Sequence, residues 1–414
     1  MDNPASRAIV QRMADPILIV GGGLNGATLA IALAQAGFPV TVIDALPVQT
    51  QRQDGFDGRA YALALASQRL LGRIGVWDAV ADHAQPMLQI KVSDGRAGEG
   101  PSPFFLAFDH AEIEEGPVGY MVEDRHLRPA LLDAMEGAGV THRPGTRVTG
   151  QAADASGVTL TLDGGGTLRG SILIGCDGRQ SAVAGRAGIN RIGWDYGQIA
   201  VTCAVAHEKD HGGIAHQFFM PGGPLAILPL KGNRSSIVWS EKRARAEHLL
   251  AMGDDEFLIA LRPAFGSFLG DISLAGARFG YPLNLTIAQQ FVAGRLALVG
   301  DAAHGLHPIA GQGLNAGLRD IGALVHVLSE ARSCGEDIGG AIVLDRYQSA
   351  RRFDTATMAL ATDGVNRLFS NDNSLLRGLR DLGLGAVSRV PALRRAFMRE
   401  AAGLSGDLPP LLRP

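Results

Sequence analysis

The feature that most constrains the fold of this chain is a glycine-rich turn between a short apolar run and an alanine-rich segment. Residues 16–20 read PILIV, a β-branched run typical of a parallel strand buried on both faces. The turn GGGLNG then places Gly21, Gly23 and Gly26 at the G-x-G-x-x-G spacing, and ATLAIALAQAG predicts a helix. Small residues in such a turn let the backbone approach a pyrophosphate at the helix N-terminus.

A second apolar strand follows the helix and ends on an acidic residue. It covers residues 40–43, and Asp44 comes 18 positions after Gly26 (44 − 26). A carboxylate at the tip of this strand accepts hydrogen bonds from ribose hydroxyls. The order strand, turn, helix, strand, acid therefore predicts a dinucleotide-binding unit, but it does not separate FAD from a nicotinamide. The alternative is a tight strand-to-helix turn that binds no ligand.

Composition narrows the class of protein further. The chain has 414 residues, which predicts two or three domains of about 150 residues each. Its 38 basic and 41 acidic residues give a net charge of −3, so no nucleic-acid partner is expected. Its three cysteines lie far apart and favour a reducing compartment. We find no signal peptide and no apolar stretch of about 18 residues, and we expect a cytoplasmic protein.

Two later segments also combine a buried strand with a polar turn. Residues 171–181 read SILIGCDGRQS, in which the apolar run is followed by Asp177. Residues 295–320 read RLALVGDAAHGLHPIAGQGLNAGLRD, in which a strand ends at Asp301 and a glycine pair, Gly311 and Gly313, opens a helix.

These three segments, in this order, resemble the fingerprints of class A flavoprotein aromatic hydroxylases. Within that class the chain is similar to the ubiquinone-biosynthesis hydroxylases, above all in the core HP-x-AGQG-x-N-x-G-x-x-D. Further matching segments read GRAYALALASQRLLGRIGVW, VEDRHL, QFFMPGGPLAILPL and FGYPL. The resemblance extends over residues 16–410.

The resemblance implies an α/β fold with a discontinuous Rossmann-like FAD-binding domain, an inserted and mostly antiparallel substrate domain, and a C-terminal helical region. The expected boundaries are 1–75, 116–185 and 285–345 for the FAD-binding domain, 76–115 and 186–284 for the substrate domain, and 346–414 for the helical region. Strand-like runs at 200–206, 215–220, 224–230 and 236–240 predict the antiparallel sheet. An apolar pocket between the two domains could be lined by Phe218, Leu228, Trp239 and Phe279, although core packing explains each of them equally well.

The resemblance also implies a reaction. FAD is the expected cofactor, with NAD(P)H as co-substrate and O2 as the second substrate. The implied activity is hydroxylation of the aromatic ring of a polyprenylated phenol through a flavin C4a-hydroperoxide, in ubiquinone biosynthesis. The alternatives are another flavin enzyme on the same scaffold, such as a prenyl reductase or an unrelated aromatic hydroxylase, and a non-catalytic subunit that holds FAD in an assembly.

Four side chains receive cofactor roles from the resemblance. Asp301 would hold the ribityl chain, Asp177 belongs to a motif associated with both FAD and NAD(P)H, Arg59 would touch flavin or pyrophosphate, and Arg125 would be a further FAD contact. One position departs from the family. An arginine usually stands three residues after the serine of the second motif, where this chain has Ala184, and Arg186 follows two residues later. This departure concerns the expected docking of the pyridine nucleotide and not the binding of FAD.

The third motif predicts how the flavin ring is stabilised. Reduced flavin carries negative charge at one edge, and the helix that opens at Gly311, Gly313, Leu314 and Asn315 would direct its positive N-terminal end there. We expect Pro308 to border the face that reacts with oxygen. His307 is the second predicted catalytic residue, either bordering flavin and substrate or handling a proton. No metal is expected, because the H-x-x-H pair of His304 and His307 lacks a third ligand. Candidate bases for the phenol are Tyr61, in a predicted helix after Arg59, and these two histidines.

The C-terminal segment predicts a surface role. Residues 371–414 carry seven arginines and four acidic residues, so the segment has a net charge of +3 (7 − 4). A basic amphipathic segment can lie on an anionic membrane surface, here the inner membrane, where a polyprenylated substrate would be collected. Other ubiquinone-biosynthesis proteins are further expected partners. The alternative is a helix packed on the domain with a solvated basic face.

Overall fold

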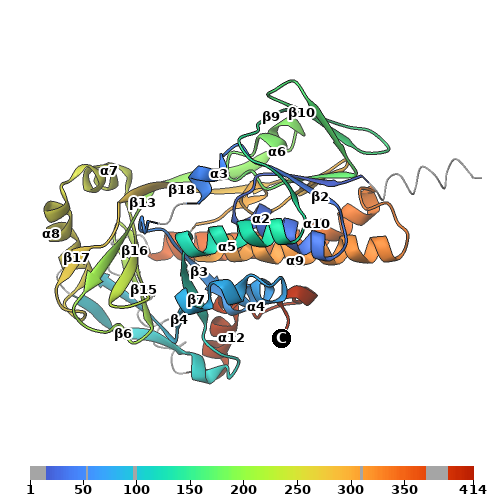
Figure 1. Cartoon of the computed structure of the whole chain (residues 1–414). Coiled ribbons are helices and arrows are strands. Elements are labelled where there is room, and N and C mark those ends of the chain that lie inside the picture. The colour runs from blue at the N-terminus through green and yellow to red at the C-terminus, as the bar shows by residue number, and fades with distance from the viewer. Residues whose placement is uncertain (1–14, 53–54, 97–99, 308–310, 370–389) are drawn as a thin grey trace, which may run out of the picture.

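The structure is a computed structural model that describes residues 15–52, 55–96, 100–307, 311–369 and 390–414. It contains a parallel sheet wrapped by long helices and a larger, mostly antiparallel sheet that carries a pair of short helices on its outer side (Figure 1). The long helices are α2 (Leu24–Gln35), α5 (Asp124–Gly137), α9 (Gln312–Ser333) and α10 (Ala341–Phe369), and the short pair is α7 (Arg243–Ala251) and α8 (Asp254–Phe265). The α/β fold class expected from the sequence is therefore confirmed.

The parallel sheet has the strand order β19-β20-β12-β1-β2-β8. Its strands are β1 (Ile17–Val20), β2 (Val40–Ile43), β8 (Thr141–Arg143), β12 (Ile172–Gly175), β19 (Val292–Ala293) and β20 (Leu296–Leu298), of which only β19 runs antiparallel to its neighbour. The residues of β1, β2, β12 and β20 are buried throughout and share one hydrophobic core with residues of α2 and α9 and with Val158 and Leu160. Helix α2 packs against α5 and α9, and α9 packs against α10. A three-stranded antiparallel meander is formed by β9 (Val148–Ala153), β10 (Val158–Leu162) and β11 (Thr167–Gly170).

The larger sheet contains the four strands expected from the alternating runs. They are β13 (Arg191–His207), β14 (Ile214–Met220), β15 (Gly223–Leu230) and β16 (Arg234–Lys242). The sheet order is β21-β18-β13-β16-β15-β14-β5-β6, with β17 beside β13. The remaining strands are β5 (Gln89–Arg96), β6 (Gly100–Asp109), β17 (Ile272–Leu274), β18 (Phe279–Ala288) and β21 (His304–Gly305).

The two faces of this sheet contact different parts of the molecule. Residues such as Val201, Phe218 and Trp239 point to α7 and α8 and form a core of their own. The alternate residues point the other way, where Leu228 and Leu230 pack with Met87 and Met121. The expectation that Phe218 and Trp239 line a pocket beside the cofactor domain is therefore wrong, because successive side chains of a strand leave on opposite faces.

A small sheet of β3 (Ala60–Ala64), β4 (Gln85–Met87) and β7 (Gly119–Glu123) lies between the two large ones. The helix predicted around Tyr61 is wrong, because Tyr61 belongs to strand β3 and is paired with Val122 of β7. The alanine-rich sequence of this segment has high helix propensity, but pairing with β7 decides its conformation. The helix begins only at Leu65, in α4 (Leu65–Arg73).

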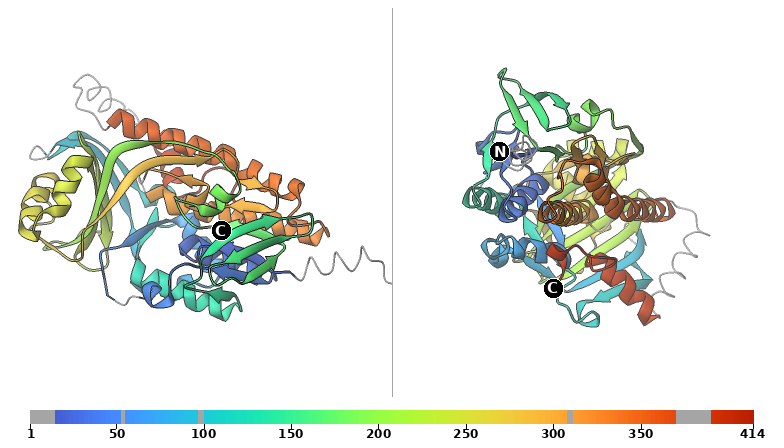
Figure 2. Two further views of the ribbon diagram at one scale, coloured as in Figure 1. Left: turned by 90° about the horizontal axis from the view of Figure 1, so that it is seen from above. Right: turned by 90° about the vertical axis from the view of Figure 1, so that its right-hand side faces the viewer.

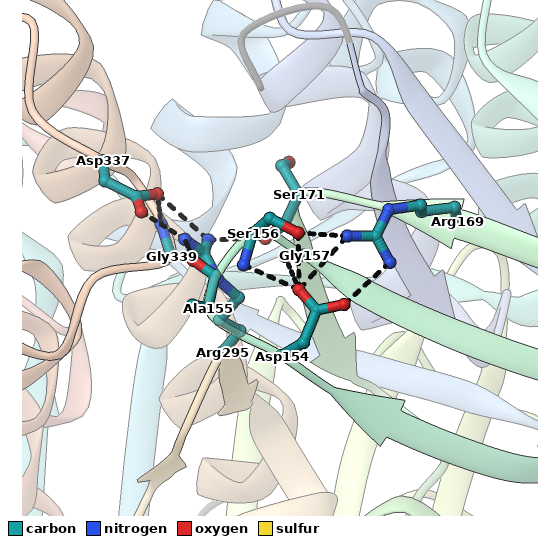
Figure 3. Close-up of polar contacts among 9 residues, drawn as sticks. All are labelled: Asp154, Ala155, Ser156, Gly157, Arg169, Ser171, Arg295, Asp337 and Gly339. Atoms are coloured by element: carbon teal, nitrogen blue, oxygen red, sulfur yellow. Dashed lines mark hydrogen bonds and ion pairs between the residues drawn. The ribbon is translucent and has the colours of Figure 1, made fainter. Parts of the chain in front are cut away.

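A polar cluster ties the edge of the parallel sheet to the loops around it (Figure 3). Buried Arg295, just before β20, donates to the carbonyls of Ser171 and Ala155 at 3.0 Å and to the carboxylate of Asp337. In the adjoining turn, Asp154 accepts from Arg169 at 3.1 Å and from the Ser156 hydroxyl at 2.6 Å, and these hydrogen bonds lower the pKa of the Asp154 carboxyl. The cluster lies at the amino ends of β12 and β20. It is therefore a structural anchor on the edge opposite the one where open α/β sheets bind ligands.

The described elements also show how the predicted domains interleave. Strands of the parallel sheet come from three separated parts of the chain, and β18 together with β21 carries the larger sheet into the segment 285–345. The exact domain boundaries remain a prediction. In the right-hand view of Figure 2, α10 and the C-terminal helix α12 (Pro391–Ala401) lie toward the same side of the molecule.

Candidate cofactor site

Four strand ends bring the predicted cofactor residues into one row. In the order β20-β12-β1-β2, the carboxyl ends of these strands lead to Asp301, Asp177, Gly21 and Asp44. Because the four strands are parallel, all these positions lie on one edge of the sheet. This is the edge at which open α/β sheets bind dinucleotides.

The glycine turn is shaped by close backbone approaches. Gly21 has φ +102°, and a Cβ atom there would lie 2.4 Å from the carbonyl oxygen of Cys176. A Cβ atom on Gly26 would lie 1.8 Å from the carbonyl oxygen of Gly21, so only glycine lets α2 pack this close to the turn. At Gly23 nothing lies within 4 Å of the same position. Gly21 and Gly26 therefore allow close packing of the backbone, and Gly23 faces the open space that a ligand requires.

Asp44 holds the turn from the neighbouring strand. It is buried, and its Oδ2 accepts the amide N–H of Gly22 at 2.8 Å. Its Oδ1 accepts the amide N–H of Leu46 at 2.8 Å. Each carboxylate oxygen has a second lone pair, so these bonds orient Asp44 and still leave it able to accept from a ribose hydroxyl.

The carboxylates of Asp177 and Asp301 have different surroundings. Asp177 accepts from the hydroxyl of Ser181, the N-cap of the short helix α6 (Ala182–Arg186), and at 3.0 Å from the amide of Val183 in its first turn. Asp301 is one-third exposed and accepts from Arg179 Nε at 3.1 Å through Oδ2. Its Oδ1 lies 4.0 Å from the position of a Cβ atom on Gly313. Asp301 therefore faces the start of α9, whereas Asp177 shapes its own loop.

The start of α9 is fixed by a fully bonded amide. Asn315 Oδ1 accepts from the Ala64 amide at 2.8 Å and from the Ser67 hydroxyl at 2.7 Å. Its Nδ2 donates to the carbonyls of Ala62 at 2.9 Å and Gly311 at 2.8 Å. The side chain thus joins α9 to β3 and α4 and has no donor left for a ligand.

The other predicted residues of this helix leave its first turn accessible. Gly311 has φ +65°, and a Cβ atom there would lie 2.9 Å from Ala62 Cβ. Gly313 and Leu314 are partly exposed. No side chain among the described residues caps the helix, so its first N–H groups are available to an electron-rich ligand.

Arg59 and Arg125 lie beside each other at the end of the small sheet. Arg59 Nε donates to Asp57 at 2.7 Å, and Arg59 Nη2 lies 3.4 Å from Asp124 Oδ2. Arg125 donates to Glu123 at 2.7 Å and its guanidinium lies 5.3 Å from the centre of the Phe56 ring. Because β3 also contacts the start of α9, these arginines border the same region as the row of strand ends.

Two of the candidate bases have other roles in the fold. Buried His304 bonds through Nε2 to Asp320 Oδ2 at 2.6 Å, and Asp320 also accepts from Arg351 at 2.8 Å. Burial alone would raise the pKa of Asp320, but the charges of His304 and Arg351 bring it below its ordinary value. Tyr61 donates to Asp124 at 2.7 Å, and burial followed by this carboxylate raises its pKa well above the ordinary value. The protonated phenol of Tyr61 is therefore no base near neutral pH.

His307 differs from these two residues. Its ring is fully buried and meets the Tyr196 ring edge-on, with 5.1 Å between centroids. Neither ring nitrogen has a hydrogen-bond partner among the residues that the structure describes. Burial, and then the charge of Arg179, lower the pKa of His307 to about 4. The ring is therefore neutral near pH 7, and its role in catalysis remains a prediction. Pro308 lies outside the described residues.

Sequence reasoning missed several residues that build this site. Arg191 donates to the carbonyls of Asp301 at 2.9 Å and Ala302 at 2.6 Å and so holds the Asp301 turn. The Asn25 side chain fills the space beside Gly300 and Gly317. Arg179 lies within the quoted motif CDGRQS, but no local pattern shows that it reaches Asp301. Arg186, two residues after Ala184, bonds Gln151 at 3.1 Å.

The neutral state of His307 predicts a pH effect on stability. Below pH 6.5 the unfolded chain protonates this histidine and the folded chain does not, so stability falls as pH decreases toward 4. Between pH 7 and pH 5, we expect the free energy of unfolding to fall by about 2 kcal/mol less in His307→Phe than in the wild type. Urea unfolding at each pH measures this difference. The exposed His248→Phe is the matched control. Equal losses in wild type and His307→Phe would contradict the assignment.

The residues on this edge fit FAD. Two helices, α2 and α9, point N-termini without a described side-chain cap toward it, and Gly23 leaves open space in front of the first. A pyrophosphate and the electron-rich edge of a reduced flavin are the groups that such ends stabilise. In the described part of the chain, no three His, Cys, Asp or Glu side chains cluster as metal ligands do.

Comparisons with known proteins agree with this fit. The family described as FAD binding domain matches residues 15–361. The chain is 45% identical to the ubiquinone hydroxylase UbiL of Rhodospirillum rubrum, over 100% of this chain and 96% of that protein. It is 40% identical to the 3-demethoxyubiquinol 3-hydroxylase of Escherichia coli K12, over 94% of this chain and 98% of that protein.

A solved structure supports the fold. The p-nitrophenol 4-monooxygenase PnpA of Pseudomonas putida DLL-E4 superposes with a TM-score of 0.78, over 95% of this chain and 98% of that one, at 20% identity. FAD is the cofactor and NAD(P)H the co-substrate expected of the family. The chain belongs to the FAD-binding flavoprotein family that includes the ubiquinone-biosynthesis hydroxylases, and it is an FAD-dependent monooxygenase.

Proposed function

We propose that this enzyme hydroxylates the aromatic ring of a polyprenylated phenol in ubiquinone biosynthesis. The observation that carries the proposal is the uncapped N-terminus of α9 beside Asp301, in a chain 45% identical to a ubiquinone hydroxylase. When bound, FAD supplies the redox chemistry, accepting hydride from NAD(P)H and reacting with O2. The residues of the chain bind and orient the cofactor and the substrate, and they exclude water from the site.

The roles of individual side chains follow from their contacts. The first N–H groups of α9 stabilise negative charge at the flavin edge, and the glycines at 311 and 313 allow close approach. Asp301, oriented by Arg179 and Arg191, accepts from cofactor hydroxyls. Arg59, oriented by Asp57, contributes a positive charge to the same region. One ring nitrogen of neutral His307 is unprotonated, and its lone pair would accept a proton from the substrate side.

The role of Asp301 is testable by cofactor binding. Asp301→Ala removes a charged acceptor, so we expect FAD affinity to fall by about ten- to a hundredfold, as expected for loss of a hydrogen bond to a charged group. Flavin fluorescence titration of the apoprotein measures the change. Glu336→Ala, which removes a surface ion pair with Arg346, is the control. Unchanged FAD affinity in Asp301→Ala would exclude the role.

The reaction is testable with labelled oxygen. Purified holoenzyme is given NADH or NADPH, a phenol with a short prenyl chain, and 18O2, and the products are analysed by mass spectrometry. We expect one labelled oxygen atom on the ring. Hydrogens added to the prenyl chain would indicate a reductase instead, and a nucleotide that is never oxidised would indicate a non-catalytic subunit. In a deletion strain, the accumulated quinone precursor would identify the missing step.

We further propose that one side of the molecule contacts a membrane surface, where a polyprenylated substrate would lie. Helix α10 exposes three large apolar side chains, which we call the apolar stripe: Phe353 is 81%, Leu360 70% and Leu368 43% accessible. Helix α12, toward the same side in Figure 2, exposes Leu393 and Phe397 although Met398 anchors it. Large exposed apolar side chains along a helix are typical of interfacial contact. Residues 370–389, which carry part of the predicted amphipathic segment, lie outside the described residues.

The contact proposed here is peripheral. Within the described ranges, no helix has the length and apolar character needed to cross a bilayer. The exposed Arg352 and Arg395 flank the apolar positions and carry charge that favours anionic lipids.

Vesicle binding tests the membrane contact. We expect the double variant Phe353→Asp, Leu360→Asp to co-sediment several-fold less with phosphatidylglycerol-containing vesicles, because it places carboxylates in the apolar stripe. Ile259→Asp, at an equally exposed position on α8, is the matched control. Retained flavin absorbance shows that each variant is folded. Equal sedimentation of the wild type and the double variant would show that α10 does not contact the membrane.

A further inference from the structure

A large cavity lies on the face of the antiparallel sheet that points away from the cofactor site. It has a volume of about 1310 Å³. Its floor is one face of β14, β5 and β6, and its wall is the end of α8 with the following loop to β17. The opposite face of the same strands packs on the small sheet. The cavity is therefore separated from the flavin region by the full thickness of the sheet.

The strand register arranges the floor in two cross-strand rows. Phe218, Ser93 and Phe105 form one row, because Ser93 pairs with both phenylalanines. His216 and Lys91 form the next row, since they are paired across β14 and β5. Residues two apart on a strand share a face, so all five side chains point into the cavity.

The wall is aromatic. The Phe268 ring lies 4.6 Å from the His216 ring and stacks on Phe265 at 5.5 Å, measured between centroids. Gly266, with φ +86°, and Gly270, with φ +78°, form the bends that bring Phe268 over the floor. An apolar body placed here would be enclosed by rings on two sides.

Two polar side chains on the floor of the cavity, Ser93 and Lys91, have no hydrogen-bond or ion-pair partner among the described residues. Ser93 is 3% exposed, and its hydroxyl has no hydrogen bond among the described residues. Lys91 forms no ion pair within the part of the chain that the structure describes. Burial, and then the charge of Lys91, lower the pKa of His216 to about 4, so its ring is neutral near pH 7. A buried hydroxyl without a partner is costly, and an ammonium in an apolar cleft favours an anion.

The other end of the cavity has the opposite charge pattern. Asp271 is paired with Arg262 at 2.6 Å, and Glu208 accepts the Asp271 amide at 3.1 Å. Asp210 also lines this end. These acids disfavour a second anionic group there, so a ligand would place its one anionic head at Lys91 and its apolar body along the phenylalanines.

We propose that this cavity is a second ligand site, distinct from the flavin site, for an amphipathic carboxylate whose head meets Lys91 and Ser93 and whose chain lies against Phe218, Phe265 and Phe268. The volume exceeds the ~300–1,000 Å³ usual for small-molecule pockets, so a chain of a dozen carbons fits. The site goes beyond the proposed hydroxylation and does not depend on it.

The test uses the holoenzyme and two probes with the same chain, dodecanoate and dodecyltrimethylammonium, in isothermal titration calorimetry. We expect dodecanoate to bind at one site and at least about tenfold more tightly than the cation, because only the carboxylate meets Lys91 and Ser93. We expect no change in flavin absorbance on binding, because the sheet separates the two sites. Equal affinity for both probes, or no saturable binding, would overturn the proposal.

Variants locate the binding. Lys91→Met keeps the length of the side chain and should weaken dodecanoate by about tenfold while leaving the cation unchanged. Phe268→Ala, at a partly exposed wall position, should weaken both probes. Lys231→Met, at an exposed lysine outside the cavity, is the matched control. Dodecanoate binding that perturbs the flavin spectrum and is indifferent to Lys91→Met would assign it to the flavin site and overturn the proposal.

Discussion

Helix α9 is held at the carboxyl edge of the parallel sheet by two buried polar side chains, and the rest of the site depends on this attachment. Near its start, Asn315 uses all four of its hydrogen-bonding positions to join β3, α4 and the residue before the helix. Five residues later, Asp320 accepts from the Gly300 amide at 2.9 Å, from His304 and from Arg351. The helix end, the Asp301 turn and α10 are thus fixed relative to one another. Removing either side chain would leave buried donors without acceptors, which is costlier than losing an exposed bond.

This attachment explains why separate chain segments form one cofactor site. The α2 N-terminus reaches the edge because glycines at 21 and 26 permit backbone contact. The α9 N-terminus reaches the same edge because Asn315 and Asp320 hold it there. Both ends have N–H groups without a side-chain cap, and in the proposed site they would stabilise negative charge, on a pyrophosphate in one case and on a reduced flavin in the other. The arrangement supplies preorganised electrostatics, which suits a protein whose cofactor carries the redox chemistry.

The antiparallel sheet divides the molecule into two chemical environments. One face supplies small and apolar side chains to the region next to β3 and β7. The other face, together with α8, forms an independent core and the large cavity. Because neighbouring residues of one strand contribute to different faces, a single segment such as β14 serves both regions. The membrane contact proposed for α10 lies on a third surface, so substrate entry and the second ligand site do not compete for the same residues.

Local sequence determined the parts of this protein that depend on short-range backbone geometry. The glycine turn, the strand before it, Asp44 and four strands of the antiparallel sheet were predictable, because period-two patterns and glycine spacing report directly on backbone conformation. Only the tertiary structure decided which partners the side chains meet. Tyr61 lies in a strand because β7 pairs with it, His304 is bonded to a carboxylate sixteen residues away, and Asp177 is bonded to the start of α6. Phe218 and Trp239 face α8 because of a strand register that long-range pairing sets. Partners distant in the chain leave no local pattern, and the free energy of burying them decides these contacts.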